Sequence, residues 1–420
     1  MKIHFIGIGG IGMSALARYS LSEDNVVTGS DLVKTEITNE LEKEGIAITK
    51  SLKNVDLVVY SNAIKDNHPE LKKAKDLGVD CIKYAEALGR ITKKYFTIAI
   101  SGTHGKSTTT AMTALTLINN GLDPTVIIGT KLKEFNNSNF RKGKSKYLVI
   151  EADEYKEAFL NYNPDIIVLT NIEADHLDYY KNIDNILNAF KKYIKKTDII
   201  IANKDDDNIL RLLKSRKFKG FSLKSKDAKI ISSVIKVPGD YNVSNALAAL
   251  EVAKFLKIKK EDAVKSLSKY NGSWRRFEIF RTKDLTIISD YAHHPTAVLK
   301  TLIATREKFN NKKITCVFQP HQYHRTYSFF NEFADALKKA PVDKIILSEI
   351  YDVKGREDKK SKKSVCSEKI VRSVNDPRVI FIKSFDEIKK YVIKNCKRGS
   401  VVVVMGAGNI YNLFLDLTKK

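Results

Sequence analysis

Cysteine is scarce in this sequence of 420 residues. The few cysteines are scattered along the chain, and no two of them have C-x-x-C spacing. This usage argues against a disulfide framework and against a zinc site, and it favours a reducing compartment. We therefore expect a cytoplasmic protein. The cysteines are Cys81, Cys316, Cys366 and Cys396.

Long hydrophobic runs are missing as well. No run reaches the roughly 18 apolar residues that a membrane-spanning helix needs. The opening stretch MKIHFIGIGGIGMSALARYS places a lysine before an apolar segment, as a signal peptide does. Its four glycines within six positions would make a poor signal helix, so we expect no leader and no membrane partner.

Acidic residues are outnumbered by basic ones, 49 against 73, which gives a formal net charge of +24. Such an excess raises nucleic acid as a partner. The lysines, however, are spread in pairs over the whole chain, without an arginine-rich block or a basic stripe interleaved with aromatics. We expect a lysine-rich solvated surface and no nucleic-acid partner. A remaining functional interpretation of the charge is the steering of anionic substrates.

Short apolar and β-branched runs alternate with helical periodicity along most of the chain. This alternation predicts an α/β fold with parallel sheets, and the length suggests about three domains. Joints near residues 91–95 and 269–277 predict domains at 1–94, 95–272 and 273–420. The strand-like runs lie at residues 2–8, 56–64, 96–101, 146–153, 165–172, 198–204, 285–292, 313–320, 344–350 and 400–408.

A glycine-rich turn, GIGGIG at residues 7–12, follows the first of these runs. Asp31 ends the next predicted strand, close to the spacing at which an acidic residue meets a ribose. Alone, the pattern is typical of NAD or FAD enzymes. It reports only a helix N-terminus that accepts a pyrophosphate, which UDP-sugars also carry. A later turn with Gly406 and Gly408 could bind an anion or serve tight strand–helix packing.

A second turn, SGTHGKS at residues 101–107, joins a strand-like run to a predicted helix. Backbone N–H groups and the helix N-terminus would hold a polyphosphate, Lys106 would add charge, and Ser107 would reach a magnesium ion. The match to the strict motif is imperfect, because Ile100 stands where that motif has glycine. We favour nucleotide phosphate binding over a tight turn with a solvated lysine.

Two acidic clusters follow strand-like runs in the middle domain. The carboxyl ends of parallel strands share one edge with the phosphate turn, so carboxylates, a hydroxyl and an imidazole could converge on magnesium there. Alternatively, the acids cap the helices that follow. For Glu151 and His176 together with the turn, we favour the metal site. The clusters are Glu151, Asp153 and Glu154, and then Asn171, Glu173, Asp175, His176 and Asp178.

A series of short motifs, in order along almost the entire chain, resembles the Mur ligase family of peptidoglycan synthesis. Each motif is weak alone, but together, at compatible spacings, they are highly specific. Within the family, the sequence is most similar to the branch that adds L-alanine. The motifs are GIGGIGMSALA, GSD, SNAI, SGTHGKSTTT, EADE, TNIEADHLD, PGDYNVSNALAAL, RRFE, DYAHHPTAV, FQPH and GAGNIY.

The resemblance implies a Rossmann-like UDP-binding domain, a central P-loop ATPase and a C-terminal Rossmann-like domain that brings the amino acid. It implies ATP and Mg²⁺, with UDP-N-acetylmuramate and L-alanine as substrates. The lactyl carboxylate would become an acyl phosphate, which the amine of L-alanine then attacks. The resemblance assigns the first glycine turn to uridine diphosphate rather than nicotinamide. We expect a monomer or a weak homodimer.

The resemblance also implies roles for individual residues. Catalysis would involve Lys106, His176, His293 and Arg325. Ser107, Glu151 and His176 would hold metal. ATP would be bound by Gly102, Thr103, His104, Gly105, Lys106, Ser107, Thr108, Asn242, Asn245, Arg276 and Asp290. The UDP-sugar would be bound by Gly9, Gly10, Ile11, Gly12, Asp31 and Ser61. The amino-acid region would contain His294, His321, Gln322 and Arg325.

Some of these roles have alternatives in the residues themselves. The planar fork of Arg325 suits a carboxylate, and a neutral histidine such as His293 could take a proton from the incoming ammonium. His176 could instead be a helix cap, and Arg276 and Asp290 could form interdomain salt bridges. Without the resemblance, Asn242 and Asn245 read as an N-cap and a surface residue.

The sequence departs from the family pattern at three positions, Tyr155, Tyr241 and Gln322. Gln322 removes a positive charge from the amino-acid region, and we assign no metal role to Lys191. The nearest rival function is the ligase that recycles a ready-made tripeptide onto UDP-N-acetylmuramate, which EADEY resembles. An NAD-dependent oxidoreductase would leave the phosphate turn without a purpose. A nucleic-acid-binding ATPase is suggested by charge alone.

Overall fold

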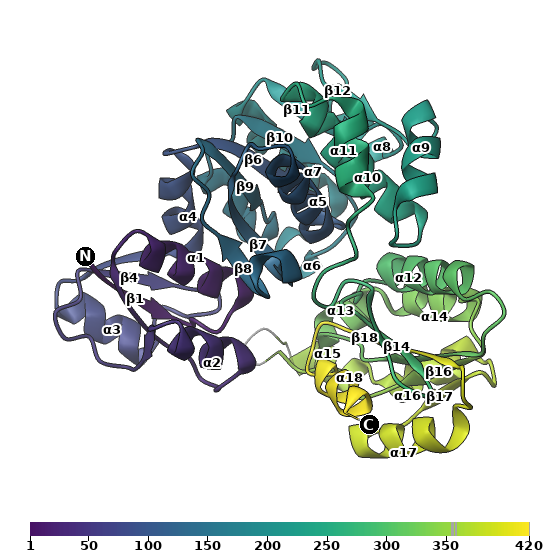
Figure 1. Cartoon of the computed structure of the whole chain (residues 1–420). Coiled ribbons are helices and arrows are strands. Elements are labelled where there is room, and N and C mark those ends of the chain that lie inside the picture. Colours follow the sequence, from purple (N-terminus) through teal and green to yellow (C-terminus); the bar gives the residue numbers. More distant parts are fainter. Residues whose placement is uncertain (354–356, 358, 420) are drawn as a thin grey trace. The chain divides into compact units, whose positions relative to one another are not determined.

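The computed structural model describes residues 1–353, 357 and 359–419, and the strands in these residues form three sheets (Figure 1). The chain divides into two compact units. The first unit carries two of the sheets and the second unit carries the third. Unit 1 comprises Met1–Glu173, Asp184–Val234 and Ser244–Lys269, and unit 2 comprises Ala174–Ile183, Ile235–Val243 and Tyr270–Lys420.

The first sheet is parallel throughout, with the strand order β3-β2-β1-β4-β5. The order reverses between β1 and β4, where open α/β sheets bind ligands beyond the carboxyl ends of their strands. Ile6 of β1 pairs with Ser30 of β2 and Tyr60 of β4, so the turns after these strands share one edge. The elements are β1 Lys2–Ile6, α1 Ile11–Ser22, β2 Val26–Ser30, α2 Glu36–Lys43, β3 Ala47–Ile48, β4 Leu57–Tyr60, α3 Pro69–Asp76, β5 Asp80–Lys83 and α4 Tyr84–Thr92.

The second sheet has the order β12-β11-β10-β6-β9-β7-β8 and is parallel except for the β7–β8 hairpin. Its central strands are buried on both faces, which is why they read as continuous apolar runs. The strands are β6 Phe96–Ser101, β7 Thr125–Leu132, β8 Ser138–Arg141, β9 Tyr147–Glu151, β10 Ile166–Leu169, β11 Ile199–Asn203 and β12 Lys219–Phe221. The helices along this part of the chain are α5 Lys106–Asn119, α6 Leu177–Tyr180, α7 Ile183–Tyr193, α8 Asp207–Leu212, α9 Lys226–Val234, α10 Asp240–Phe255 and α11 Lys260–Leu267, with 3₁₀ turns at Lys133–Phe135, Tyr155–Asn161 and Ile194–Lys196. Of these, α6 and the start of α10 belong to unit 2.

The third sheet, in unit 2, has the order β13-β14-β18-β15-β16-β17, and only β13 is antiparallel to its neighbour among the described strands. Alternate valines of the central strand β18 enter the two separate hydrophobic clusters on its faces. The strands are β13 Glu278–Arg281, β14 Thr286–Asp290, β15 Ile314–Phe318, β16 Lys344–Leu347, β17 Val379–Phe381 and β18 Val401–Met405. The helices are α12 Pro295–Lys308, α13 Tyr323–Ser328, α14 Phe330–Lys339, α15 Lys359–Ser364, α16 Ser367–Val374, α17 Phe385–Asn395 and α18 Tyr411–Thr418.

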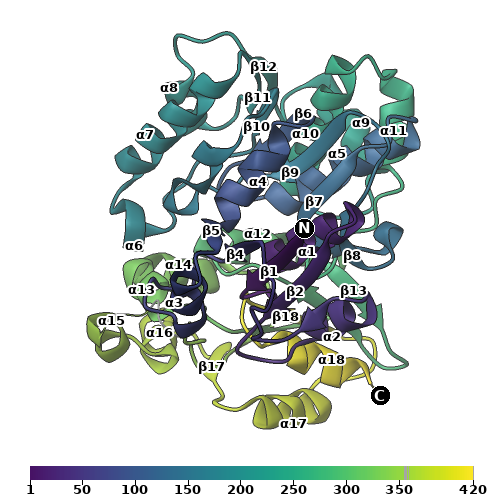
Figure 2. The same cartoon turned by 90° about the vertical axis from the view of Figure 1, so that its left-hand side faces the viewer.

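Polar side chains attach helix α1 of the first sheet to the β7–β8 hairpin of the second, and Figure 2 shows these elements side by side. The amide of Asn139 donates to the Ile11 carbonyl at 2.5 Å and accepts from Arg18 at 2.6 Å. Lys131, only 4% exposed, contacts Glu40 of α2 at 2.7 Å. We call Arg18, Lys131 and Asn139 the α1 clamp. It holds two sheets together within unit 1.

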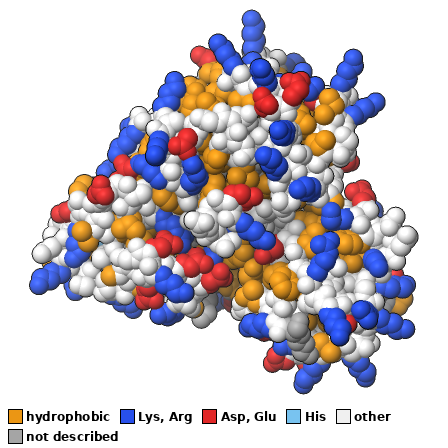
Figure 3. Space-filling model, in the orientation of Figure 1, with side chains coloured by type: hydrophobic (Ala, Val, Ile, Leu, Met, Phe, Trp, Pro, Cys, Tyr) orange, Lys and Arg blue, Asp and Glu red, His pale blue; other side chains and the backbone are white. Residues whose placement is uncertain are grey.

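Each strand-like run named from the sequence contains a strand, so the mainly parallel α/β prediction is confirmed. One sheet falls within each predicted domain, whose boundaries stay predictions. Among the described residues, none of the helices combines the length and apolar character that crossing a membrane requires. Figure 3 shows Lys and Arg side chains spread over the visible face and mixed with other types, rather than gathered in one patch.

Candidate active site

Two glycines shape the turn between β6 and α5. Gly102 and Gly105 have φ of +134° and +81°, values that favour glycine. A Cβ on Gly105 would lie 2.3 Å from the side-chain oxygen of Asn245, and one on Gly102 would lie 2.2 Å from the Thr170 hydroxyl. Neighbouring side chains therefore close around the backbone, which is why glycine stands at both positions.

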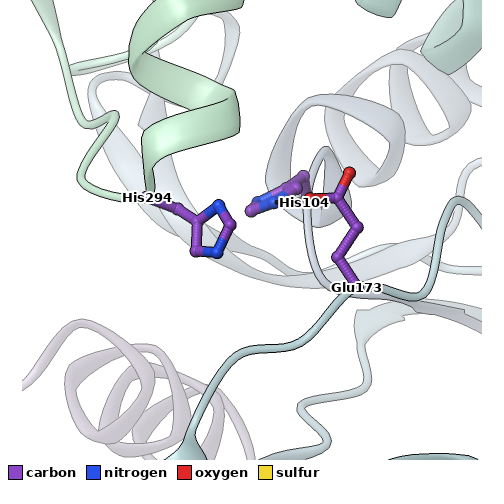
Figure 4. Close-up of side chains that lie close together, drawn as sticks. All are labelled: His104, Glu173 and His294. Atoms are coloured by element: carbon purple, nitrogen blue, oxygen red, sulfur yellow. Dashed lines mark ion pairs between the residues drawn. The ribbon is translucent and has the colours of Figure 1, made fainter. Parts of the chain in front are cut away.

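The segment after β10 holds this turn in place. The backbone N–H of His104 donates to the side chain of Asn171 at 2.8 Å, and the Thr170 hydroxyl donates to the His104 carbonyl at 2.7 Å. Figure 4 shows the His104 ring and the Glu173 carboxylate, which lie 3.5 Å apart. Thr103 donates its N–H to the Asn171 carbonyl at 3.0 Å. The turn is thus fixed before any ligand arrives.

Lys106, the first residue of α5, is paired within the chain. Its ammonium donates to the Gly102 carbonyl at 2.6 Å and to the two carboxylate oxygens of Glu154 at 2.8 and 3.1 Å. Burial acts to lower the pKa of Lys106, but the charges of Glu154 and Asp153 outweigh it and raise the pKa. The lysine is therefore a cation at neutral pH.

Ser107 and Glu151 meet at the end of β9. The serine hydroxyl donates to one carboxylate oxygen of Glu151 at 3.1 Å, and the other oxygen accepts the Gly129 N–H at 2.5 Å. A hydroxyl and a carboxylate side by side are the hard oxygen ligands that Mg²⁺ takes, so this pair fits the predicted ion. Thr108 follows in the same helix turn and is buried.

The two asparagines predicted to contact adenine both lie on α10, three positions apart. Asn245 belongs to unit 1, where its side-chain oxygen accepts the Thr109 hydroxyl of α5 at 3.1 Å. Asn242 belongs to unit 2, and its amide donates to the Pro238 carbonyl at 2.7 Å. Asn245 therefore lies at the phosphate turn within unit 1, and the contacts of both asparagines with adenine stay predictions.

The first glycine turn opens α1, with Gly10 as N-cap and no side-chain capping bond. Asp31, at the end of β2, accepts the Gly9 N–H at 2.8 Å, and a Cβ on Gly9 would lie 2.9 Å from this carboxylate. Ser61 follows β4 at the same edge and hydrogen-bonds the Ile6 carbonyl through its N–H at 3.1 Å.

Two more predicted residues of this turn are used within the protein. Gly12 packs against Tyr84, whose ring atoms a Cβ would approach to 3.0 Å, and the Ile11 carbonyl is held by the α1 clamp. The residues predicted to bind the uridine diphosphate therefore lie at one sheet edge, and their contact with that ligand stays a prediction.

In unit 2, Arg325 of α13 pairs with Asp175. The guanidinium donates to one carboxylate oxygen at 3.0 and 3.2 Å, and both side chains are over nine-tenths buried. Burial acts to raise the pKa of Asp175, but the charge of Arg325 holds it well below its usual range. Arg325 also donates to the side chain of Gln322 at 3.1 Å. Part of the fork predicted to grip a substrate carboxylate is thus occupied by the chain itself.

His293 lies in the same group. Burial, followed by the charge of Arg325, lowers the pKa of His293 well below its usual range, so the ring is neutral at neutral pH. Its Nδ1 lies 2.9 Å from the Tyr291 carbonyl. The His321 ring lies 5.8 Å from that of His293 and stacks on Tyr351 at 5.4 Å between centroids.

Two further histidines stand at helix N-termini in unit 2. His294 precedes α12, as Figure 4 shows, and its Nε2 lies 3.1 Å from the Ala174 carbonyl. His176 is the N-cap of α6 with φ of +53°, and its N–H donates to Asp175 at 2.7 Å. His176 and the Ser107–Glu151 pair belong to different units, so a metal site shared by the three stays a prediction.

Asp290 is tied to its own domain. Its two carboxylate oxygens accept the N–H groups of Phe277 and Ala292, each at 2.8 Å, and burial raises its pKa. These bonds join the start of β13 to the end of β14. The Arg276 guanidinium lies over the Tyr291 ring at 4.8 Å. Contacts of Asp290 and Arg276 with ATP stay predictions.

The last glycine turn favours the packing alternative over anion binding. The carbonyls of Gly406 and Gly408 accept hydrogen bonds from Arg275 at 2.7 and 3.0 Å. A Cβ on Gly408 would lie 2.5 Å from Tyr351. A turn that presents carbonyl oxygens to a cation is poorly suited to hold a phosphate.

The structure shows contacts of three residues for which the sequence predicted no individual role. Glu154 pairs with Lys106, Asn171 holds the phosphate turn, and Arg275 holds the last glycine turn. Glu154 and Asn171 stand in the acidic clusters, so the motif marked the region but not the partner. Of the departures, Tyr155 is buried, and Tyr241 packs against the core of the third sheet.

These folds and turns define a nucleotide-binding α/β protein of three domains, and the family comparisons identify its kind. Family models described as Mur ligase family, catalytic domain, as Mur ligase middle domain and as Mur ligase, glutamate ligase domain match residues 2–96, 100–253 and 275–408. The chain belongs to the Mur ligase family.

Relatives match along the full length. UDP-N-acetylmuramate–L-alanine ligase of Acetivibrio thermocellus is 39% identical, over 98% of this chain and 94% of that protein. The enzyme of the same name from Clostridium tetani is also 39% identical, over 99% and 98%. The crystal structure of UDP-N-acetylmuramate-alanine ligase from Thermotoga maritima has a TM-score of 0.83 at 30% identity, covering 100% and 98%. A murein peptide ligase from Psychrobacter arcticus shares the fold, with a TM-score of 0.73 at 24% identity over 100% and 98%.

Proposed function

We propose that this chain is an ATP-dependent, amide-forming ligase that joins L-alanine to the lactyl carboxylate of UDP-N-acetylmuramate in peptidoglycan precursor synthesis. The observation that carries the proposal is the full-length similarity to L-alanine ligases, at 39% identity. The phosphate turn, with its largely buried lysine and its serine–carboxylate pair, independently supports the use of ATP.

Unit 1 supplies the energy of the reaction in this proposal. The N–H groups of residues 102–107 and the Lys106 ammonium would hold the phosphates of ATP, whose approach to a second anion needs positive charge. Ser107 and Glu151 would hold Mg²⁺, with His176 as a further ligand. When bound, the ion would neutralise charge on the phosphates and on the carboxylate that they meet. The turn at residues 7–12 would take the uridine diphosphate, with Asp31 at its ribose.

Unit 2 supplies the amino acid. His293 is neutral because burial lowers its pKa. A lowered pKa also makes the ring a weak base, so the role that this direction supports is to accept a hydrogen bond from the amine of L-alanine and orient it, rather than to remove its proton. The face of Arg325 beside His321 and Gln322 would meet the carboxylate of L-alanine. Since Arg325 is shared with Asp175, and Gln322 is uncharged, this grip is weaker than that of a free guanidinium.

The remaining expectations belong to the same proposal. They are domain boundaries at residues 94/95 and 272/273, a monomer or weak homodimer, and no nucleic-acid or membrane partner. A cytoplasmic location is supported by the four unpaired cysteines, which suit a reducing compartment. Recycling of a tripeptide is a weaker candidate, since the murein peptide ligase supports the fold alone.

A phosphate-release assay with UDP-N-acetylmuramate and MgATP tests the proposal across L-alanine, glycine, L-serine and the tripeptide. We expect L-alanine to give the highest kcat/KM and the tripeptide to give none. Stimulation by the tripeptide and not by L-alanine would move the assignment to the recycling branch. Turnover that depends on NADH or nucleic acid, without the sugar nucleotide, would contradict the ligase function.

A further inference from the structure

The lysine of the phosphate turn already has an anion as its partner. The Lys106 ammonium contacts both carboxylate oxygens of Glu154, at 2.8 and 3.1 Å, and the two side chains are 16% and 4% exposed. Separating a largely buried ion pair costs free energy, because each charge would then lie out of water without a partner. Any phosphate that binds Lys106 therefore meets an occupied cation.

The backbone after β9 determines which carboxylate reaches the lysine. Glu154 starts a short 3₁₀ segment, Tyr155–Asn161, and its carbonyl accepts the Glu157 N–H at 2.9 Å. The side chain of Asp153 stays exposed and accepts the Tyr155 N–H at 3.2 Å. The two adjacent carboxylates thus differ in burial and in contact, since Glu154 is buried and hydrogen-bonds Lys106, whereas Asp153 is exposed.

A nucleotide adds several negative charges at this place. Like charges in contact repel strongly where water is largely excluded, so phosphate and Glu154 cannot both stay against the lysine at full strength. The Gly102 carbonyl, 2.6 Å from the ammonium, offers no negative charge to be displaced. Exchange of the carboxylate for a phosphate oxygen relieves the repulsion and keeps the lysine paired.

We propose that Glu154 is a positioning residue that serves as the internal counter-ion of Lys106, and that nucleotide phosphate exchanges for it on binding. The inference rests on the proposed function. In the empty protein the pair keeps the buried lysine and its turn in place. When nucleotide binds, part of its binding free energy is used to separate Lys106 from Glu154, so the observed affinity is lower than it would be without the pair. Because the same pair stabilises the ligand-free protein, ligand-free stability and nucleotide affinity are linked.

Titration calorimetry of MgADP on the full-length chain tests this exchange in Glu154→Gln, with Asp153→Asn as the matched control. Both variants remove one negative charge near the turn. We expect the Kd of Glu154→Gln for MgADP to fall about tenfold or more, because no buried pair must be broken. Asp153 also acts on the charge of Lys106, but it is exposed and screened, so Asp153→Asn should tighten MgADP binding by clearly less than Glu154→Gln does.

Thermal unfolding of the same proteins gives a second measurement. Without nucleotide, Glu154→Gln should melt at a lower temperature than the unsubstituted chain. With saturating MgADP, its Tm should rise further than that of the unsubstituted chain. If Glu154→Gln does not fold, Glu154→Asp keeps the charge but is one methylene too short, and it should tighten MgADP binding in the same direction.

Unchanged or weaker MgADP binding in the folded variants would overturn the exchange, because it would mean that Glu154 stays on Lys106 in the complex. This result is distinguishable from failure of the proposed function. If the proposed function were wrong, the unsubstituted chain itself would not bind MgADP, and this result would overturn both the ligase function and the exchange at Lys106.

Discussion

The two glycine turns of unit 1 face their ligands with different donors. At the first turn, a backbone N–H of Gly9 holds the carboxylate of Asp31. At the second, the side chain of Lys106 holds the carboxylate of Glu154. Both turns therefore carry an anion from a neighbouring strand end, but Asp31 is expected to work with the ligand, on its ribose, whereas Glu154 is expected to leave it.

The glycine turn of unit 2 sharpens the comparison. There the backbone carbonyls of Gly406 and Gly408 meet the guanidinium of Arg275, so the polarity is reversed. A strand–glycine–helix pattern thus does not by itself predict the charge of its partner. What decides is whether the turn presents N–H groups or carbonyl oxygens.

The largest expected effect comes from removing the Lys106 ammonium, a side-chain donor that the second turn has and the first turn lacks. Lys106→Ala should lower kcat by about a thousandfold, the scale for losing a cation that stabilises phosphoryl transfer. Binding of UDP-N-acetylmuramate, measured by calorimetry, should stay nearly unchanged, because it uses the first turn. Lys94→Ala, at an exposed position, serves as the control. If Lys106→Ala lost both turnover and UDP-N-acetylmuramate binding, the two turns would not bind separate ligands.

A smaller effect tests how closely the second turn is enclosed. Gly105 and Gly121 lie on either side of α5 with nearly equal φ, +81° and +78°, but only a Cβ at Gly105 meets a neighbour within 4 Å. Alanine should cost about 1 to 2 kcal/mol at either site from its backbone conformation. Gly105→Ala should cost about 1 to 3 kcal/mol more, from overlap with Asn245. Urea unfolding measures both, and equal losses would contradict a tight fit.

The smallest expected effect separates the two carboxylates. Asp31→Ala should weaken UDP-N-acetylmuramate binding about tenfold, the scale of one charged hydrogen bond, and leave MgADP binding unchanged. The sign is opposite to that expected for Glu154→Gln at the other turn. If Asp31→Ala tightened binding, both carboxylates would be displaced counter-ions, and the contrast between the turns would disappear.

Local pattern predicts the parts of this protein that depend on neighbours in sequence. A short apolar, β-branched run bounded by turn residues predicts a buried strand, and β18 with the glycine turn after it is an example. The edge strands β8 and β13, SNFR and EIFR, were not predicted, since they are short and partly polar. Their pairing is set by the adjacent strand rather than by their own pattern.

Ion pairs between residues far apart in the chain could not be predicted from the sequence, for a physical reason. Lys106 and Glu154 are 48 positions apart, and Asp175 and Arg325 are 150 apart. The strand pattern predicted only that Lys106 and Glu154 follow strands that end at the same sheet edge. Which of two adjacent carboxylates then turns inward depends on the backbone of a short 3₁₀ segment, which no periodicity records.

The α1 clamp has a consequence for the covalent link between the first two sheets at residues 93–95. Arg18 and Asn139 join α1 to β8 by hydrogen bonds that do not depend on this link. A loop insertion there would lengthen the path of the chain without widening the span between the uridine turn and the phosphate turn. Loss of the Asn139 amide would have the reverse outcome, an intact chain with a loosened span.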